Sequence, residues 1–254
     1  MAGSLRMVVC LAAVGGELSG MAVRLLWERC SRRGRLGRCL ADLEENGKVR
    51  LVGEGRLDRR VLRLTEDGRG EAQGGIDPPS RWSRRWDRRW RIVAFDIPES
   101  ATALRTRLRR RLHEFRFGWL QNSVWISPDP IDAFRAGLNE KTTFPDSLTF
   151  LEAATVGGES SEAMVAAAWD FPALAKSHAG YLDVLRLRPG ARRPFESWAN
   201  WVGTEQRAWR RVSRLDPFLP RELLPDGYVG EQVWAARREA FAEFGSVLAK
   251  VLAV

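Results

Sequence analysis

The sequence predicts a multidomain α+β protein, and three patterns along the chain support this fold class. Residues 1–75 show helical periodicity and then a hairpin, residues 92–160 alternate strands with helices, and residues 161–254 are mainly helical. The chain has 254 residues, of which 44% are hydrophobic, so it can build packed cores and is not globally disordered. No segment approaches the roughly 18 apolar residues of a membrane span, so we expect no membrane association.

The first 75 residues have the layout of a winged helix-turn-helix, which is a DNA-reading domain. Glycines separate the first two helices, and Gly47 ends the third. The apolar run at residues 7–14 is short for a secretion signal, so we interpret it as part of a core helix. The expected helices cover residues 4–14, 20–30 and 31–46, and the expected strands of the wing cover residues 49–52 and 60–65.

Arginines mark one surface of this predicted domain. In the third helix, the face opposite the apolar stripe carries Arg35 and Arg38, as in a recognition helix. The alternative is an ordinary solvated basic face, and Gly34 and Gly37 lower the helix propensity by about 1 kcal/mol each. The candidate DNA-binding residues are Arg32, Arg33, Arg35 and Arg38 at this helix and Arg56, Arg59 and Arg60 on the wing.

The distribution of charge supports a polyanionic partner at the N-terminal end. The 41 basic residues comprise 37 Arg and 4 Lys, and the net charge is +9. Residues 1–75 and 76–91 each carry +4, whereas residues 92–160 carry −1 and residues 161–254 carry +2. The excess of Arg over Lys alone also fits a composition bias of the genome. Its location favours DNA contact through the N-terminal domain.

Residues 76–91 form a junction rich in Trp and Arg. Trp82, Trp86 and Trp90 recur every four residues, which predicts one helical face, with Trp90 belonging to the next strand. Such indoles either stack on nucleic-acid bases or are buried at a domain interface, and burial is the commoner role.

Residues 92–160 predict the order βαββαβ, the split ferredoxin-like motif. A buried strand at residues 92–95 precedes a helix that Ser100 is expected to cap. A hairpin turns at Gln121-Asn122, and Asp129-Pro130 is expected to start the second helix. The last strand covers residues 148–151.

The cysteines and histidines exclude several kinds of site. Cys10, Cys30 and Cys39 form no CxxC pair and no even set, which predicts a reducing cytoplasm. Only His113 and His178 are present, too few for typical His-based zinc sites or triads. We expect no cofactor and no catalytic residues.

Several segments resemble the PaaX family of bacterial transcriptional repressors. Residue 228 is Tyr where the family pattern leads us to expect Trp. The resemblance is specific in the middle and C-terminal parts, whereas in residues 1–75 only the layout matches. The segments that carry it are Trp90–Glu99, Phe117–Pro128, Trp169-Asp170, and Asp216–Pro225 followed by Gly230.

The resemblance implies a winged helix, a central domain similar to Cas2 and a helical C-terminal domain. It also implies a homodimer that binds palindromic operators in double-stranded DNA and represses catabolic genes. Some members of the family release DNA on binding an aryl-CoA thioester, so the resemblance leaves two alternatives for this chain, an acyl-CoA effector or none.

The similarity to Cas2 raises two alternatives. In Cas2 proteins an Asp at the end of the first strand can bind a divalent cation, and Asp96 matches that position. A metal-dependent nuclease is therefore one rival function. A nucleic-acid-binding assembly scaffold is the other.

Overall fold

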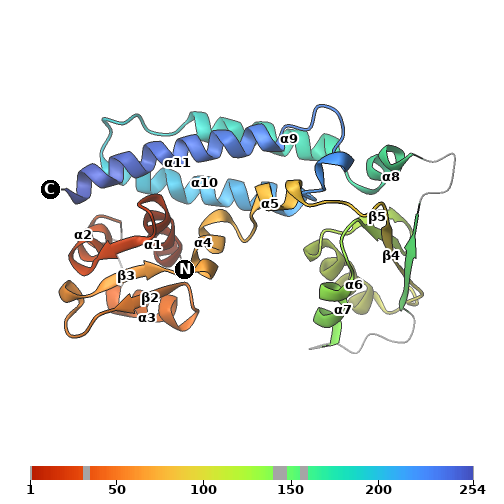
Figure 1. Ribbon diagram of the computed structural model, residues 1–254, viewed down its shortest axis with the longest axis horizontal. Coiled ribbons are helices and arrows are strands. Elements are labelled where there is room, and N and C mark those ends of the chain that lie inside the picture. Colours follow the sequence, from red (N-terminus) through yellow and green to blue (C-terminus); the bar gives the residue numbers. More distant parts are fainter. Residues whose placement is uncertain (1, 31–34, 140–147, 155–159, 254) are drawn as a thin grey trace. The chain divides into compact units, whose positions relative to one another are not determined.

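The computed structural model describes residues 2–30, 35–139, 148–154 and 160–253. The chain divides into two compact units, each built from discontinuous segments (Figure 1). The first unit comprises Met1–Asp77, Ser177–Ser213 and Gly230–Val254, and the second comprises Pro78–Lys176 and Arg214–Val229. Within the described residues, no helix is both long enough and apolar enough to cross a membrane.

The N-terminal part of the first unit combines helices with a small antiparallel sheet of order β1-β3-β2. The predicted helices and hairpin are present, although residues 31–34 lie outside the described residues. Sequence reasoning missed the short β1, η1 and α4. The elements are α1 (Ala2–Ala13), β1 (Glu17–Ser19), α2 (Gly20–Cys30), α3 (Leu36–Glu45), β2 (Val49–Val52), η1 (Leu57–Arg59), β3 (Val61–Leu64) and α4 (Glu66–Gln73).

A glycine allows the β2–β3 loop to pack tightly on α2. A Cβ atom on Gly20 would lie 1.7 Å from the Leu57 carbonyl oxygen, a distance that no side chain tolerates. The Gly20 N–H donates to the Arg60 carbonyl oxygen at 2.8 Å. The start of α2 and the base of this loop are therefore held together by the backbone itself.

Long C-terminal helices complete the first unit. They are α9 (Phe171–Arg186) from Ser177 onward, α10 (Phe195–Leu215) up to Ser213, and α11 (Gly230–Leu252), and they run side by side in Figure 1. Arg237 on α11 is buried, donates to Glu205 of α10 at 2.7 Å, and lies over the rings of Trp209, Trp234 and Phe241. A paired, hydrogen-bonded charge of this kind is costly to disrupt because its partner would be left buried alone.

The same helices bind the C-terminal end of α4. Gln206 and Arg237 donate to the Ala72 carbonyl oxygen at 3.2 and 3.1 Å, and the Trp209 indole donates to the Gln73 carbonyl oxygen. Helix ends leave such carbonyls without intrahelical partners, so side chains from α10 and α11 satisfy them. The division into units therefore differs from the predicted domains, because residues 161–254 do not form a unit of their own.

The second unit contains the predicted βαββαβ order. Its antiparallel sheet has the order β5-β6-β4-β7. Helices α6 and α7 bury Leu108, Leu112 and Phe134 against Val93 and Trp125 of the sheet. The elements are β4 (Trp90–Phe95), α6 (Thr102–Glu114), β5 (Gly118–Gln121), β6 (Val124–Ser127), α7 (Asp132–Asn139) and β7 (Leu148–Ala153).

The opposite face of this sheet is covered by later segments. Helix α8 (Ser161–Ala168) packs with the Asp216–Pro225 segment around Trp90 and Ile126. A Cβ atom on Gly118 would lie 2.6 Å from the Trp169 ring, so the glycine in β5 permits this close approach. The three prolines keep the segment non-helical except for η2 (Arg221–Leu223).

Two predicted helix caps are wrong. Helix α6 begins at Thr102 with Ala101 at the N-cap position, and Ser100 is exposed in the turn before it. Helix α7 begins only at Asp132. The Asp129 carboxylate instead accepts hydrogen bonds from the guanidinium groups of Arg81 and Arg84, which are stronger partners than backbone N–H groups.

The predicted tryptophan face is also wrong, because helix α5 (Pro78–Ser83) ends before Trp86. Trp82 and Trp90 are nevertheless buried, and Trp86 packs on Trp90 with ring centroids 5.1 Å apart. These contacts favour a structural role for the buried indoles over stacking on nucleic-acid bases.

Candidate nucleic-acid interface

Helix α3 presents a basic N-terminal end to solvent. Arg35 occupies its N-cap position with extended backbone, and Arg38 follows in the first turn. Both side chains are exposed, and neither forms an ion pair with any described residue. Unpaired guanidinium groups beside a helix N-terminus are suited to phosphates and base edges. Arg32 and Arg33 lie outside the described residues.

The opposite face of α3 is anchored in the core. Cys39, Leu40 and Leu43 are buried, and the Cys39 thiol donates to the Ser4 hydroxyl of α1 at 3.4 Å. Burial raises the pKa of the Cys39 thiol, which keeps it protonated. This packing leaves the Arg38 face free of the core.

The C-terminal half of α3 is acidic, so the helix is electrically polarised along its length. Asp42, Glu44 and Glu45 are exposed there. Glu44 accepts a hydrogen bond from the Leu51 N–H at 3.0 Å and thereby joins α3 to β2. A polyanion would be attracted to the Arg35 end of the helix and repelled from its other end.

The three arginines predicted on the wing have different environments in the structure. Arg56 and Arg59 are exposed and form no ion pair with a described residue. Arg60 is half-buried, and its guanidinium donates to the Leu51 carbonyl oxygen at 3.2 Å. We therefore assign Arg60 to holding β2 and β3 together.

Sequence reasoning missed Arg50 in β2. It is exposed, lies opposite Arg63 in the strand register, and forms no ion pair with a described residue. Arg63 itself is paired with Glu17 at 2.7 Å. The alternation of apolar and polar residues from Val49 to Leu51 could have placed Arg50 on the solvent face.

Asp96, the candidate metal ligand, is exposed immediately after β4. Within the described part of the chain, no three His, Cys, Asp or Glu side chains are grouped so that they could hold a metal ion. One carboxylate per chain is a poor site for the metal that phosphodiester hydrolysis requires.

Three arginines in the second unit are at least partly buried and packed against other groups. We call Arg81, Arg84 and Arg116, with Asp129 and Asp216, the arginine cluster. Arg116 donates to the Asp216 carbonyl oxygen at 2.5 Å and lies 4.9 Å from the centre of the Phe218 ring. Burial, with repulsion from Arg81, lowers the pKa of Arg116 to about 10. The guanidinium stays charged near neutral pH.

The cluster joins the segments that carry the resemblance. Tyr228 donates to the Asp216 carboxylate at 2.6 Å, and its hydroxyl accepts from the Trp82 indole at 3.1 Å. The other Asp216 carboxylate oxygen accepts from the Phe218 N–H at 2.8 Å. These motif residues therefore build the core of the second unit, and Tyr228 supplies a hydroxyl bridge where Trp was expected.

Comparison with protein families decides the identity of the central segment. Residues 83–165 match the PaaX protein central Cas2-like domain. This match assigns the central segment, about a third of the chain, to the domain type found in PaaX proteins. The resemblance inferred from the sequence is thus confirmed for the central segment, and it suggests a transcriptional regulator.

Two further comparisons bear on the whole chain. The uncharacterized protein Rv0674 from Mycobacterium tuberculosis has a similar fold, with a TM-score of 0.60 and 20% identity. The alignment covers 97% of this chain and 94% of that one. No curated protein gives a significant match. The similarity of fold to this protein therefore extends well beyond residues 83–165.

Proposed function

We propose that this PaaX-family protein is a sequence-specific DNA-binding transcriptional regulator that acts in the cytoplasm as a homodimeric repressor of a catabolic operon. The elements α1, β1, α2, α3, β2 and β3 then form a winged helix-turn-helix. Helix α3 enters the major groove, and the β2–β3 loop acts as the wing.

One observation carries the proposal: Arg35 and Arg38 at the N-terminal end of α3 are exposed, form no ion pair with a described residue, and lie on the face opposite the buried stripe of the helix. Arg56 and Arg59 in the β2–β3 loop offer further contacts to an adjacent phosphate backbone or minor groove. Most other arginines discussed above are already engaged by carboxylates, carbonyls or rings.

A homodimer would match a palindromic operator, since two-fold protein symmetry mirrors the symmetry of the half-sites. The family resemblance favours release by an acyl-CoA effector. Both statements belong to the proposal and rest on the resemblance.

The rival functions predict different behaviour. A Cas2-like nuclease would degrade nucleic acid with Mg²⁺ or Mn²⁺ and lose that activity in Asp96→Ala. An assembly scaffold would bind operator and random DNA with equal affinity. The isolated exposed position of Asp96 favours neither an intact metal site nor hydrolysis.

The test is binding of the full chain to its own upstream DNA and to a scrambled fragment of equal length, at several salt concentrations. We expect specific binding that weakens steeply as salt rises, because phosphate contacts release counterions. The double variant Arg35→Ala/Arg38→Ala should lose most discrimination, at about 1–3 kcal/mol for each lost base contact.

Arg238→Ala is the matched control, because Arg238 is equally exposed but lies on α11. It removes a positive charge without touching α3. If it lowers discrimination as much as the double variant does, the assignment of α3 is wrong.

A further inference from the structure

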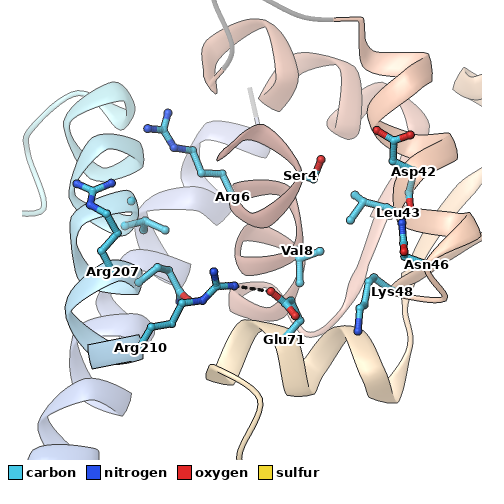
Figure 2. A pocket seen from close by; sticks show the side chains of 13 residues that line it. Ser4, Arg6, Val8, Asp42, Leu43, Asn46, Lys48, Glu71, Arg207 and Arg210 are labelled. Carbon is cyan, nitrogen blue, oxygen red and sulfur yellow. Dashed lines mark hydrogen bonds and ion pairs between the residues drawn. The ribbon is translucent and has the colours of Figure 1, made fainter. Parts of the chain in front are cut away.

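Several surface arginines of this chain are neutralised by a neighbouring carboxylate. On α10, Arg210 pairs with Glu71 of α4 at 2.5 Å, beside a pocket of about 600 Å³ in the first unit (Figure 2). On α9, Arg186 pairs with Asp183 at 2.7 Å. Pairs of this kind leave little net field, so a row of arginines without carboxylate partners identifies a surface that attracts anions.

Helix α6 of the second unit has one neutralised side. Arg111 donates to the Gly137 carbonyl oxygen of α7 at 3.1 Å and to the Glu114 carboxylate at 2.8 Å. Residues four apart share a face of a helix, so Arg107 lies on the same side as Arg111, toward α7. Arg110 also lies 3.8 Å from Glu114. The positive charge on this side is therefore partly balanced within the helix itself.

The other side of α6 carries a basic row without such a partner. Arg105, Arg109 and His113 are spaced four residues apart, over about 12 Å of helix. Arg105 donates to the Ile97 carbonyl oxygen at 3.3 Å, Arg109 is exposed, and neither arginine pairs with a described carboxylate. Burial and the charge of Arg109 lower the pKa of His113, so the positive field of Arg109 reaches the end of the row.

An exposed indole lies near the His113 end of this row. Trp119 of β5 is 52% exposed, and its Nε1 donates to the Asn122 carbonyl oxygen at 3.1 Å, which fixes the ring. The strand register places Trp119 opposite Trp125, so both side chains leave the sheet on one face. The centre of the Trp125 ring in turn lies 4.9 Å from that of His113. We call the surface formed by Arg105, Arg109, His113 and Trp119 the α6–β5 surface.

The α6–β5 surface combines the two features that bind unpaired nucleic acid. Guanidinium groups bind phosphates, and an aromatic ring stacks on a base. The bases of a duplex are already stacked on one another, so an exposed indole favours a single strand. An acidic peptide would pair with the arginines without needing an aromatic platform.

We propose that the α6–β5 surface binds single-stranded nucleic acid. A base stacks on Trp119, and neighbouring phosphates lie along Arg109 and Arg105. The surface belongs entirely to the second unit, whereas α3 belongs to the first. Binding of a single strand here therefore does not depend on DNA recognition by α3.

The test is the fluorescence anisotropy of a labelled thymidylate oligonucleotide of about ten nucleotides, titrated with the full chain at several salt concentrations. We expect saturable binding that weakens as salt rises, because phosphate contacts release counterions. Oligoglutamate of equal charge should compete about tenfold more weakly, because it supplies the charge without the bases.

Variants locate the site. Trp119→Ala should weaken binding of the oligonucleotide about tenfold, whereas Trp119→Phe should retain most of it, because a phenyl ring also stacks on a base. Arg109→Gln should weaken binding about fivefold and lower the salt slope by about 0.7. Arg107→Gln is the matched control, because it removes the same charge from the α7 side of the same helix, and it should weaken binding less than about twofold. Urea unfolding of each variant verifies that the fold is retained.

The proposal is overturned if the oligonucleotide does not bind saturably, if oligoglutamate competes as well as the oligonucleotide itself, if Trp119→Ala binds like the parent, or if Arg109→Gln binds like Arg107→Gln. The double variant Arg35→Ala/Arg38→Ala separates this surface from α3. It should bind the single strand within about twofold of the parent, since independent sites contribute additively. A larger loss, equal to that of Trp119→Ala, would place the oligonucleotide on α3 and would also overturn the proposal.

Failure here is distinguishable from failure of the proposed function. A chain that discriminates its operator duplex but does not bind the single strand refutes only the α6–β5 surface. A chain that binds the single strand through Trp119 but does not discriminate the operator refutes only the regulator.

Discussion

The α3–wing surface and the arginine cluster of the second unit use the same side chain in opposite ways. Arg35, Arg38 and Arg56 are exposed without ion pairs to described residues, whereas Arg84 and Arg116 are packed against carboxylates, carbonyls and a ring. Both regions are rich in arginine in the sequence. Burial and partners, rather than the number of charges, therefore distinguish a binding surface from a structural core.

The largest effect should come from the centre of the arginine cluster. Asp216→Ala removes the acceptor of the Tyr228 hydroxyl and the Phe218 N–H, and it takes a negative charge away from Arg116. We expect a loss of about 3 kcal/mol in the free energy of unfolding, because buried polar groups lose their partners. Urea denaturation measures it. An unchanged midpoint would show that the cluster is not structural.

Asp129→Ala should have a smaller effect on the same cluster. It leaves Arg81 and Arg84 without their shared carboxylate, at a cost of about 2 kcal/mol for hydrogen bonds to charged groups. The smaller value follows from the partial exposure of these side chains. Asp132→Ala, at the start of α7, is the control and should change stability by no more than about 0.5 kcal/mol.

The wing also contains both kinds of arginine, a hydrogen-bonded Arg60 and an exposed Arg56. Arg60→Ala should lower stability by about 1 kcal/mol because the hydrogen bond to Leu51 is lost. Arg56→Ala should leave the free energy of unfolding unchanged while it weakens DNA binding and lowers the salt slope by about 1. Urea denaturation and DNA-binding curves of both variants, measured in parallel, separate the effect on stability from the effect on binding. If the two substitutions had equal effects on stability and on DNA binding, Arg60 and Arg56 would not have different roles.

The smallest effect concerns pH. Burial and the nearby Arg109 lower the pKa of His113 from 6.5, so the unfolded chain binds this proton more readily than the folded chain. The contribution of His113 to stability is present above pH 6.5 and is lost as pH falls below it, by less than about 1 kcal/mol because solvent screens the exposed ring. Unfolding of the parent and of His113→Gln at about pH 7.5 and 5.5 tests this. The variant should lose less stability on acidification, and an equal loss would contradict the assignment.

Local sequence patterns were sufficient to predict the helices and strands that show a clear side-chain periodicity. The strand at Ile92–Phe95 and the hairpin at Asn122 follow from side-chain alternation and turn chemistry, and the structure contains both. The cap predicted at Asp129 is wrong because this carboxylate binds Arg81 and Arg84, which are distant in sequence. Short-range rules do not include these competitors.

The candidate interface could be predicted only in outline. The apolar stripe of α3 identified the face that carries Arg38, but the different role of Arg60 depends on the Leu51 carbonyl across the strand pair. The approach of Arg6 to Gly203 was beyond sequence reasoning, since the two residues lie far apart along the chain. Contacts of that range leave no periodic signal.

The discontinuous first unit has a consequence for synthesis. Its N-terminal segment leaves the ribosome well before α10 and α11, which supply the partners of the Ala72 and Gln73 carbonyls. At about 5–20 residues per second, those carbonyls await their partners for on the order of ten seconds. During that interval the nascent chain exposes the apolar side of α1, where Gly245 of α11 later approaches Ala13. A chaperone that covers apolar surface would therefore act on the N-terminal segment during this interval.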